Sequence, residues 1–104
     1  MINYAEEIKM PFDFQLSDEL KTTIKVLAKK NPKMTEAINK KIKQIIQSNK
    51  YTIDHYKNCR YDLKEYKRVH IMKHFVLLFK VFKEKNFVLF DKFGHHDDIY
   101  KRKK

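Results

Sequence analysis

The chain has 104 residues, of which 42% are hydrophobic and 13% aromatic, enough for one packed domain and too many for a disordered chain. Its single cysteine excludes an internal disulfide bond and agrees with a reducing cytosol. The formal net charge is +11, and because residues 1–19 are acidic on balance, the chain after Glu19 carries about +15. This charge favours a polyanionic partner such as RNA, DNA, anionic lipid or an acidic protein. A lysine-rich solvated surface is the alternative explanation of the charge.

These numbers predict one domain over residues 1–104, with a short basic tail at 101–104. The first residues lack the basic start and apolar run of a signal peptide. The most apolar stretch, residues 75–82, is too short to span a bilayer and contains Lys80. We therefore expect a cytoplasmic protein.

The first half of the chain predicts a strand followed by two helices. Apolar and polar side chains alternate over residues 12–16, which is typical of a half-buried strand. Ser17 then offers an N-cap, and Asn31 with Pro32 ends the first helix and begins a second that runs to about Ser48. The apolar positions with helical spacing are Leu20, Ile24, Leu27 and Ala28 in the first helix and Met34, Ile38, Ile42, Ile45 and Ile46 in the second. Because the connection is so short, the two helices should form an antiparallel hairpin.

The second half predicts strands. Residues 49–63 show no clear period and predict an ordered loop, after which a strand leads to residues 75–82, apolar on both faces as in a central strand. Residues 83–86 predict a hairpin turn, and 87–90 return antiparallel. The predicted fold class is α+β, in the order β-α-α-β-β-β, with the helical hairpin packed on one face of an antiparallel sheet.

Histidines are unusually frequent in this second half. They are His55, His70, His74, His95 and His96. Arg68 and His70 alternate with Val69 and Ile71, so they should face an open groove if the helices cover the other face. Gly94, the only glycine, predicts a backbone bend that other residues would adopt only at a cost.

Two kinds of chemistry compete for these side chains. Zn²⁺ needs three convergent ligands, and neither the adjacent His95 and His96 nor any HExxH or Cys/His pattern supplies them, so no metal or other cofactor is expected. Metal-free cleavage of RNA needs a base for the 2′-hydroxyl, an acid for the leaving 5′-oxygen and cations for the phosphate charge. Imidazoles can supply the first two and Arg or Lys the third. Purely structural histidines are the remaining alternative.

Two segments carry a family resemblance. Residues 66–80, YKRVHIMKHFVLLFK, and residues 93–100, FGHHDDIY, resemble the signature of the RelE/ParE toxin superfamily, most closely its YafQ branch. That branch has an R-x-x-H-I strand before an aromatic and aliphatic run, and a final G-x-H-x-D before an aliphatic and an aromatic residue. The order of predicted elements also matches the family fold.

The resemblance implies roles for individual residues. His70 and His96 match the branch's acid–base histidines, and Tyr100 matches an aromatic residue that positions the substrate. His55 loosely matches an upstream histidine, and His74 stands where the branch has a catalytic aspartate.

The resemblance also limits where a catalytic cation can come from. Val76 stands where the RelE branch has a catalytic arginine, so Arg68 or Lys67 would have to supply the positive charge.

By resemblance the chain is a toxin of a type II toxin–antitoxin system. The implied activity is ribosome-dependent, metal-free cleavage of mRNA by attack of the 2′-hydroxyl, with an antitoxin as partner in a heterotetramer. The alternative within the superfamily is a non-enzymatic inhibitor of DNA gyrase of the ParE kind, which needs no histidine cluster. A plain nucleic-acid-binding or regulatory module is a third possibility.

Overall fold

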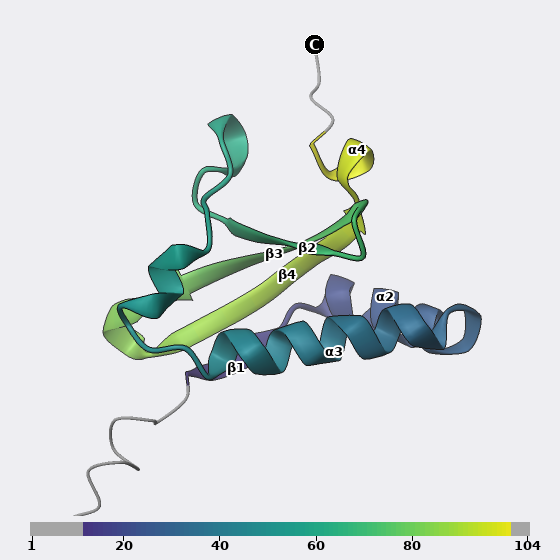
Figure 1. The fold of residues 1–104 in the computed structure, drawn as a ribbon, viewed down its shortest axis with the longest axis horizontal. Coiled ribbons are helices and arrows are strands. Elements are labelled where there is room, and N and C mark those ends of the chain that lie inside the picture. The colour runs from purple at the N-terminus through teal and green to yellow at the C-terminus, as the bar shows by residue number, and fades with distance from the viewer. Residues whose placement is uncertain (1–11, 101–104) are drawn as a thin grey trace, which may run out of the picture.

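The computed structural model describes residues 12–100, and the predicted basic tail at 101–104 lies outside them. The helices and strands are β1 (Asp13–Leu16), α2 (Asp18–Lys30), α3 (Pro32–Ile46), β2 (Lys67–Ile71), β3 (Phe75–Phe82), β4 (Phe87–His95) and α4 (His96–Ile99), with short 3₁₀ turns η1 (Thr52–His55), η2 (Tyr61–Leu63) and η3 (Lys83–Lys85). The four strands form one sheet in the order β1-β4-β3-β2 (Figure 1). The predicted α+β class and the order of its strands and first two helices are confirmed. No described helix is long and apolar enough to cross a membrane.

Local capping determines where the two long helices begin. The Leu20 N–H donates to the Ser17 side chain at 3.0 Å, and the Met34 N–H donates to the Asn31 side chain at 3.2 Å. Pro32 stands at the start of α3, where its missing N–H has no helical partner in any case. The predicted helical hairpin is confirmed, with α3 ending at Ile46, two residues earlier than expected.

The main core lies between the helical hairpin and one face of the sheet. Figure 1 shows the hairpin lying along that face. Its buried side chains include Leu20, Ile38, Ile42 and Ile45 from the helices and Leu77, Phe79, Val88 and Phe90 from the sheet. Burial of side chains of this size stabilises the fold by about 1.5–3 kcal/mol each. Val69 and Ile71 of β2 belong to this core, so the predicted assignment of that strand's two faces is confirmed.

A second, smaller cluster occupies the opposite face. Cys59, Val76 and Leu78 are buried there, and Leu63, Tyr66, Ile99 and Tyr100 pack against them. Residues 49–63, predicted as an ordered loop, supply part of this cover through η2, and α4, which was not predicted, supplies the rest (Figure 1). The face away from the helices is therefore only partly covered.

Strand β4 is longer than predicted and joins β1 in parallel, so the sheet is mixed and not wholly antiparallel as predicted. Asp13 pairs with Phe87 and Leu16 with Phe90, whereas β3 pairs antiparallel along the whole of β4. Phe79 pairs with Phe90 and Leu78 with Lys92, which leaves the intervening Asp91 as a bulge. The polar residues at this bulge broke the apolar pattern and made the strand seem to end at Phe90.

The bulge is held by side-chain contacts. The Tyr66 hydroxyl donates to the carboxylate of Asp91, and burial together with that carboxylate raises the pKa of Tyr66 to about 12. Tyr66 therefore stays protonated at neutral pH and remains the donor.

The prediction for Gly94 is wrong. No described glycine has a positive φ, and Gly94 is an ordinary strand residue paired with Val76. A Cβ at this position would lie 3.4 Å from Cγ1 and Cδ1 of Ile99. The absence of a side chain therefore lets α4 pack closely on the end of the sheet, rather than allowing a bend.

Candidate functional site

Arg68 and His70 lie on the sheet face away from the helical hairpin. Arg68 pairs with Leu78 and His70 with Val76, two residues of the smaller cluster on that face. Val76 pairs in turn with Gly94, so His70 lies two strand spacings, about 10 Å, from the backbone of β4 just before α4.

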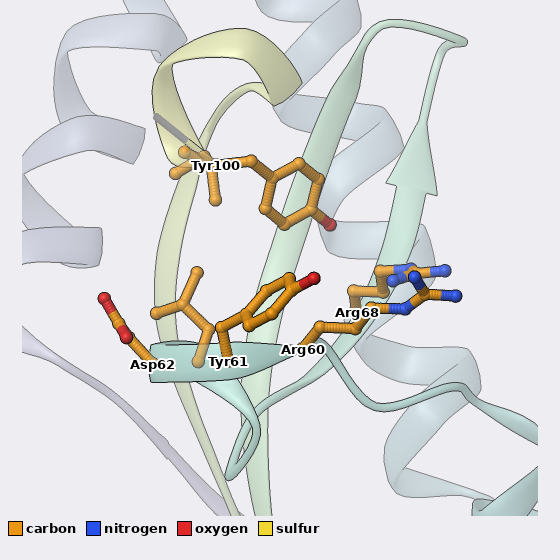
Figure 2. A pocket seen from close by; sticks show the side chains of 7 residues that line it. Arg60, Tyr61, Asp62, Arg68 and Tyr100 are labelled. Carbon is orange, nitrogen blue, oxygen red and sulfur yellow. The ribbon is translucent and has the colours of Figure 1, made fainter. Parts of the chain in front are cut away.

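A pocket of about 340 Å³ opens on the same face. Its lining residues are Arg60, Tyr61, Asp62, Leu63, Arg68, Ile99 and Tyr100. Figure 2 shows that Arg60 and Arg68 extend to the same side of this pocket and that the hydroxyl groups of Tyr61 and Tyr100 point toward that side. Two guanidinium groups and two aromatic rings thus line one hollow of ligand size.

Tyr61 has an unusual backbone conformation. Its φ of 58° lies in the left-handed region, which is costly for a bulky residue. The residue is 68% exposed, so burial of the ring does not offset the cost of this backbone conformation. Met72, Lys73 and Asn86 also have a positive φ, so the conformation of Tyr61 agrees with a place for η2 in the site but does not by itself mark it.

Tyr100 presents a polar atom that lacks a protein partner. Its hydroxyl oxygen is buried and makes no hydrogen bond within residues 12–100, although Arg68 and Cys59 lie beside it. Burial raises the pKa of Tyr100, with Cys59 reinforcing and Arg68 opposing that shift. Burial likewise raises the pKa of the free Cys59 thiol. The hydroxyl of Tyr100 therefore stays neutral, and Arg68 and Cys59 are the polar groups that lie beside it.

Three histidines form a second group beside α4, which we call the three-histidine cluster (His74, His95 and His96). One nitrogen from each lies within 4.8 Å of the others. The rings of His74 and His95 stack with centroids 5.9 Å apart, and those of His95 and His96 are 4.7 Å apart. The β3–β4 pairing brings them together: Phe75 pairs with His95, and the His96 N–H donates to the His74 carbonyl at 2.8 Å.

Helix α4 connects the cluster to the pocket. The Tyr100 N–H donates to the His96 carbonyl at 3.0 Å, so the two residues stand one helical turn apart. Side chains at positions i and i+4 share one face of a helix. His96 therefore lies one helical turn before Tyr100, although His96 is not itself among the residues that line the pocket.

The structure separates His55 from the other histidines. His55 ends η1, where Asp54 pairs with Lys83 just beyond the C-terminal end of β3. Lys83 and Lys67 lower the pKa of Asp54, which keeps this contact ionic. The three-histidine cluster lies at the other end of β3, about 25 Å away for a strand of eight residues.

The ammonium group of Lys67 also contacts residues outside the pocket. Its side chain is buried, and its ammonium group donates to the Tyr56 carbonyl at 2.9 Å and to the Asn58 side chain at 3.1 Å. Asp54 lies 3.7 Å from the same group. Of the two cations expected to meet phosphate, Arg68 lines the pocket and Lys67 does not.

Three residues of these groups were missed by the sequence analysis. Arg60 and Tyr61 lie in a segment without period, and only their adjacent basic and aromatic character could have suggested a nucleic-acid contact. His95 was counted with the histidines but was given no role. We expected no three metal ligands to converge, yet His74, His95 and His96 do. Strand pairing, and not sequence spacing, brings His74 to the other two.

Comparison with individual known proteins shows which family the chain belongs to. No family model matches the chain. A protein of Methanocaldococcus jannaschii with the name "Putative toxin RelE4" is 41% identical over 93 residues, which cover 89% of this chain and 95% of that protein. An uncharacterised protein of Methanosarcina mazei is 38% identical over 86 residues, covering 83% of this chain and 95% of its own length.

Solved structures agree in fold at low sequence identity. YafQ of Escherichia coli has a TM-score of 0.67 at 14% identity, covering 86% of this chain and 98% of its own. A chain of the RelBE2 toxin–antitoxin complex of Mycobacterium tuberculosis has a TM-score of 0.65 at 14% identity. The match covers 82% of this chain and 91% of that chain. Together with the 41% identical relative, these findings show that the chain belongs to the RelE family and is a toxin of a toxin–antitoxin system.

Proposed function

We propose that this toxin is an endoribonuclease that cleaves mRNA on the ribosome, without a metal in the chemical step. The observation that carries the proposal is the pocket in which Arg60 and Arg68 meet Tyr61 and Tyr100. Guanidinium groups recognise phosphate oxygens, and aromatic rings stack on unpaired bases. A single-stranded nucleotide offers both a phosphate and an unpaired base.

We assign proton transfer to His70 on β2 and His96 at the start of α4. Neither side chain lines the pocket itself, and His70 lines a separate hollow beside Lys40, Lys41 and Gln44 of α3. One takes the proton of the 2′-hydroxyl as that oxygen bonds to the adjacent phosphorus. The other gives a proton to the 5′-oxygen as its bond to phosphorus breaks. The products are a 2′,3′-cyclic phosphate and a 5′-hydroxyl. His74 contacts His96 and is placed to assist it, whereas His55 is too distant for a direct part.

The pocket residues stabilise the phosphate charge and position the nucleotide. Arg68, joined by Arg60, stabilises the charge that grows on the phosphate oxygens. Tyr61, an exposed residue, offers a stacking surface, and Tyr100 lines the same pocket.

Replacing either arginine tests this assignment. Arg68→Ala and Arg60→Ala should each reduce cleavage of a defined mRNA on purified ribosomes by about 100-fold, as expected for the loss of a group that binds the transition-state charge. Lys21→Ala, an exposed residue of α2, is the matched control and should cleave like the parent. The cuts are mapped by sequencing of the 5′ ends. Growth arrest with intact transcripts and broken DNA would instead support gyrase inhibition of the ParE kind.

A separate prediction concerns the association of the toxin with its antitoxin. Because the toxin carries a net charge of +11, we propose that an acidic antitoxin segment covers the pocket and folds on binding, in a heterotetramer of two toxins and two antitoxins. The association rate should fall about tenfold or more as ionic strength rises from about 0.01 M to 1 M, because screening removes electrostatic steering. Stopped-flow mixing measures this rate. A basic partner, or a rate that does not depend on salt, would contradict the model.

A further inference from the structure

The three-histidine cluster has the composition of a metal site that the sequence did not suggest. We propose that His74, His95 and His96 bind a Zn²⁺ ion, and that the bound ion inhibits the toxin by withdrawing His96 from RNA cleavage. The inhibitory part rests on the proposed function, whereas the binding site rests on the geometry of the cluster alone.

The positions of the imidazoles fit such an ion after small side-chain rotations. Their nitrogens lie within 4.8 Å of one another. Tetrahedral zinc, with bonds of about 2.0–2.1 Å, holds nitrogen ligands about 3.4 Å apart. His74 is exposed and follows a tight turn, and His95 and His96 are only half-buried, so their rings have room to close this gap. Imidazole is a preferred ligand of zinc, and three such ligands leave the fourth position for water.

Asp97 supplies the outer contact that zinc-binding histidines usually have. Its Oδ1 lies 3.0 Å from Nδ1 of His96. Its Oδ2 also lies 3.8 Å from Nδ1 of His95. A carboxylate near Nδ1 favours a proton on that nitrogen, which would leave Nε2 as the nitrogen that binds a metal. This arrangement is independent of the distances within the cluster and points to the same ligand.

His95 has a competing contact. Its Nδ1 accepts the Asp97 N–H at 3.1 Å and so caps α4. Coordination through Nε2 requires a proton on Nδ1 and would break this hydrogen bond. Zinc binding should therefore be coupled to a small adjustment at the start of α4, the helix that also carries Tyr100 into the pocket.

The consequence for the toxin follows from the double use of His96. An imidazole whose Nε2 lone pair binds zinc, and whose Nδ1 proton is held by Asp97, can neither accept nor donate a proton on the RNA. The ion would also fix α4 at the rim of the pocket. Zinc should thus act as a reversible inhibitor, and its removal should restore activity.

Direct binding tests the site without reference to activity. Zinc alone is titrated by calorimetry into the full chain stripped of metal, and imidazole nitrogens are followed by ¹⁵N–¹H NMR. We expect one ion per chain, with shifts at the nitrogens of His74, His95 and His96. His95→Asn keeps a capping side chain for α4 but removes a ligand, and it should lower zinc affinity about 100-fold or more.

Two further variants make this result specific. Asp97→Asn should lower the affinity about tenfold or more, because it weakens the outer contact to His96. His55→Asn removes a histidine from the far end of the sheet and should leave the affinity unchanged. Absence of stoichiometric binding, or equal affinity in the parent and His95→Asn, would overturn the site.

The inhibition is tested by comparing each protein with itself. Cleavage of ribosome-bound mRNA is measured with and without one equivalent of zinc. The parent should lose activity with zinc and regain it on chelation, whereas His95→Asn should respond far less. Full activity of the zinc-loaded parent would overturn the inhibition and leave the binding result standing. A parent that cuts no RNA under any condition would refute the proposed function and the inhibition with it, while the titration still decides the site.

Discussion

His70→Ala and His96→Ala should each lower the rate of mRNA cleavage by about 10²–10⁴-fold, the usual effect of losing a general acid or base. Both side chains lie at the surface of the sheet's open face or its rim, and neither belongs to the two hydrophobic clusters. Their loss should therefore change the free energy of unfolding by no more than about 0.5 kcal/mol. The combination of a large kinetic effect with a small effect on stability distinguishes catalysis from a structural role.

The measurement is single-turnover cleavage of a programmed ribosome complex, with thermal unfolding of each variant recorded alongside. His55→Ala is the matched control, because His55 is an exposed histidine at the far end of β3. It should cleave at close to the parental rate. If both His70→Ala and His96→Ala arrest growth as strongly as the parent, these histidines are not the proton-transfer pair.

A 2′-deoxy sugar at the cut position should make an otherwise identical mRNA inert. In the proposed mechanism the 2′-oxygen is the nucleophile, so its removal eliminates the reaction instead of slowing it. The same mechanism requires a 5′-hydroxyl on the downstream product. These two outcomes are checked by incubating matched ribo- and 2′-deoxy-substituted messages with the toxin and by testing whether a kinase can label the new 5′ ends.

Chelation provides the complementary test of the same chemistry. With the RNA already held in the site, excess EDTA should leave cleavage intact, or increase it if zinc occupies the three-histidine cluster. The RNA must be bound first, because ribosomes themselves need Mg²⁺. Products with 5′-phosphate ends, or efficient cutting of the 2′-deoxy message, would mean that water is the nucleophile and that the mechanism is wrong, even though the family stands.

Much of the fold was predictable because local rules determine it. Ser17 and Asn31 cap helices with their own side chains, and the spacing of Ile38, Ile42 and Ile45 marks the buried face of α3. The alternation of Val69 with His70 likewise separated the core face of β2 from its open face. Each of these signals lies within a few residues of its effect. The place of Arg68 on the open face, where it lines the pocket, could therefore be predicted from the sequence.

Only the tertiary structure decided how distant segments meet. The sequence of residues 13–16 does not predict that β1 lies parallel to β4. The polar Asp91 likewise does not indicate that β4 continues beyond it after a bulge. The pocket exists because η2, β2 and α4, separated along the chain, pack against one small cluster, which brings Arg60 to Arg68 and Tyr100.

The three-histidine cluster arises in the same way, from the register that sets Phe75 opposite His95. Strand register and long-range packing depend on the summed burial of many side chains, which no short window of the sequence contains. The sequence by itself therefore determined which side chains are available for chemistry, and the tertiary structure decided which of them act together.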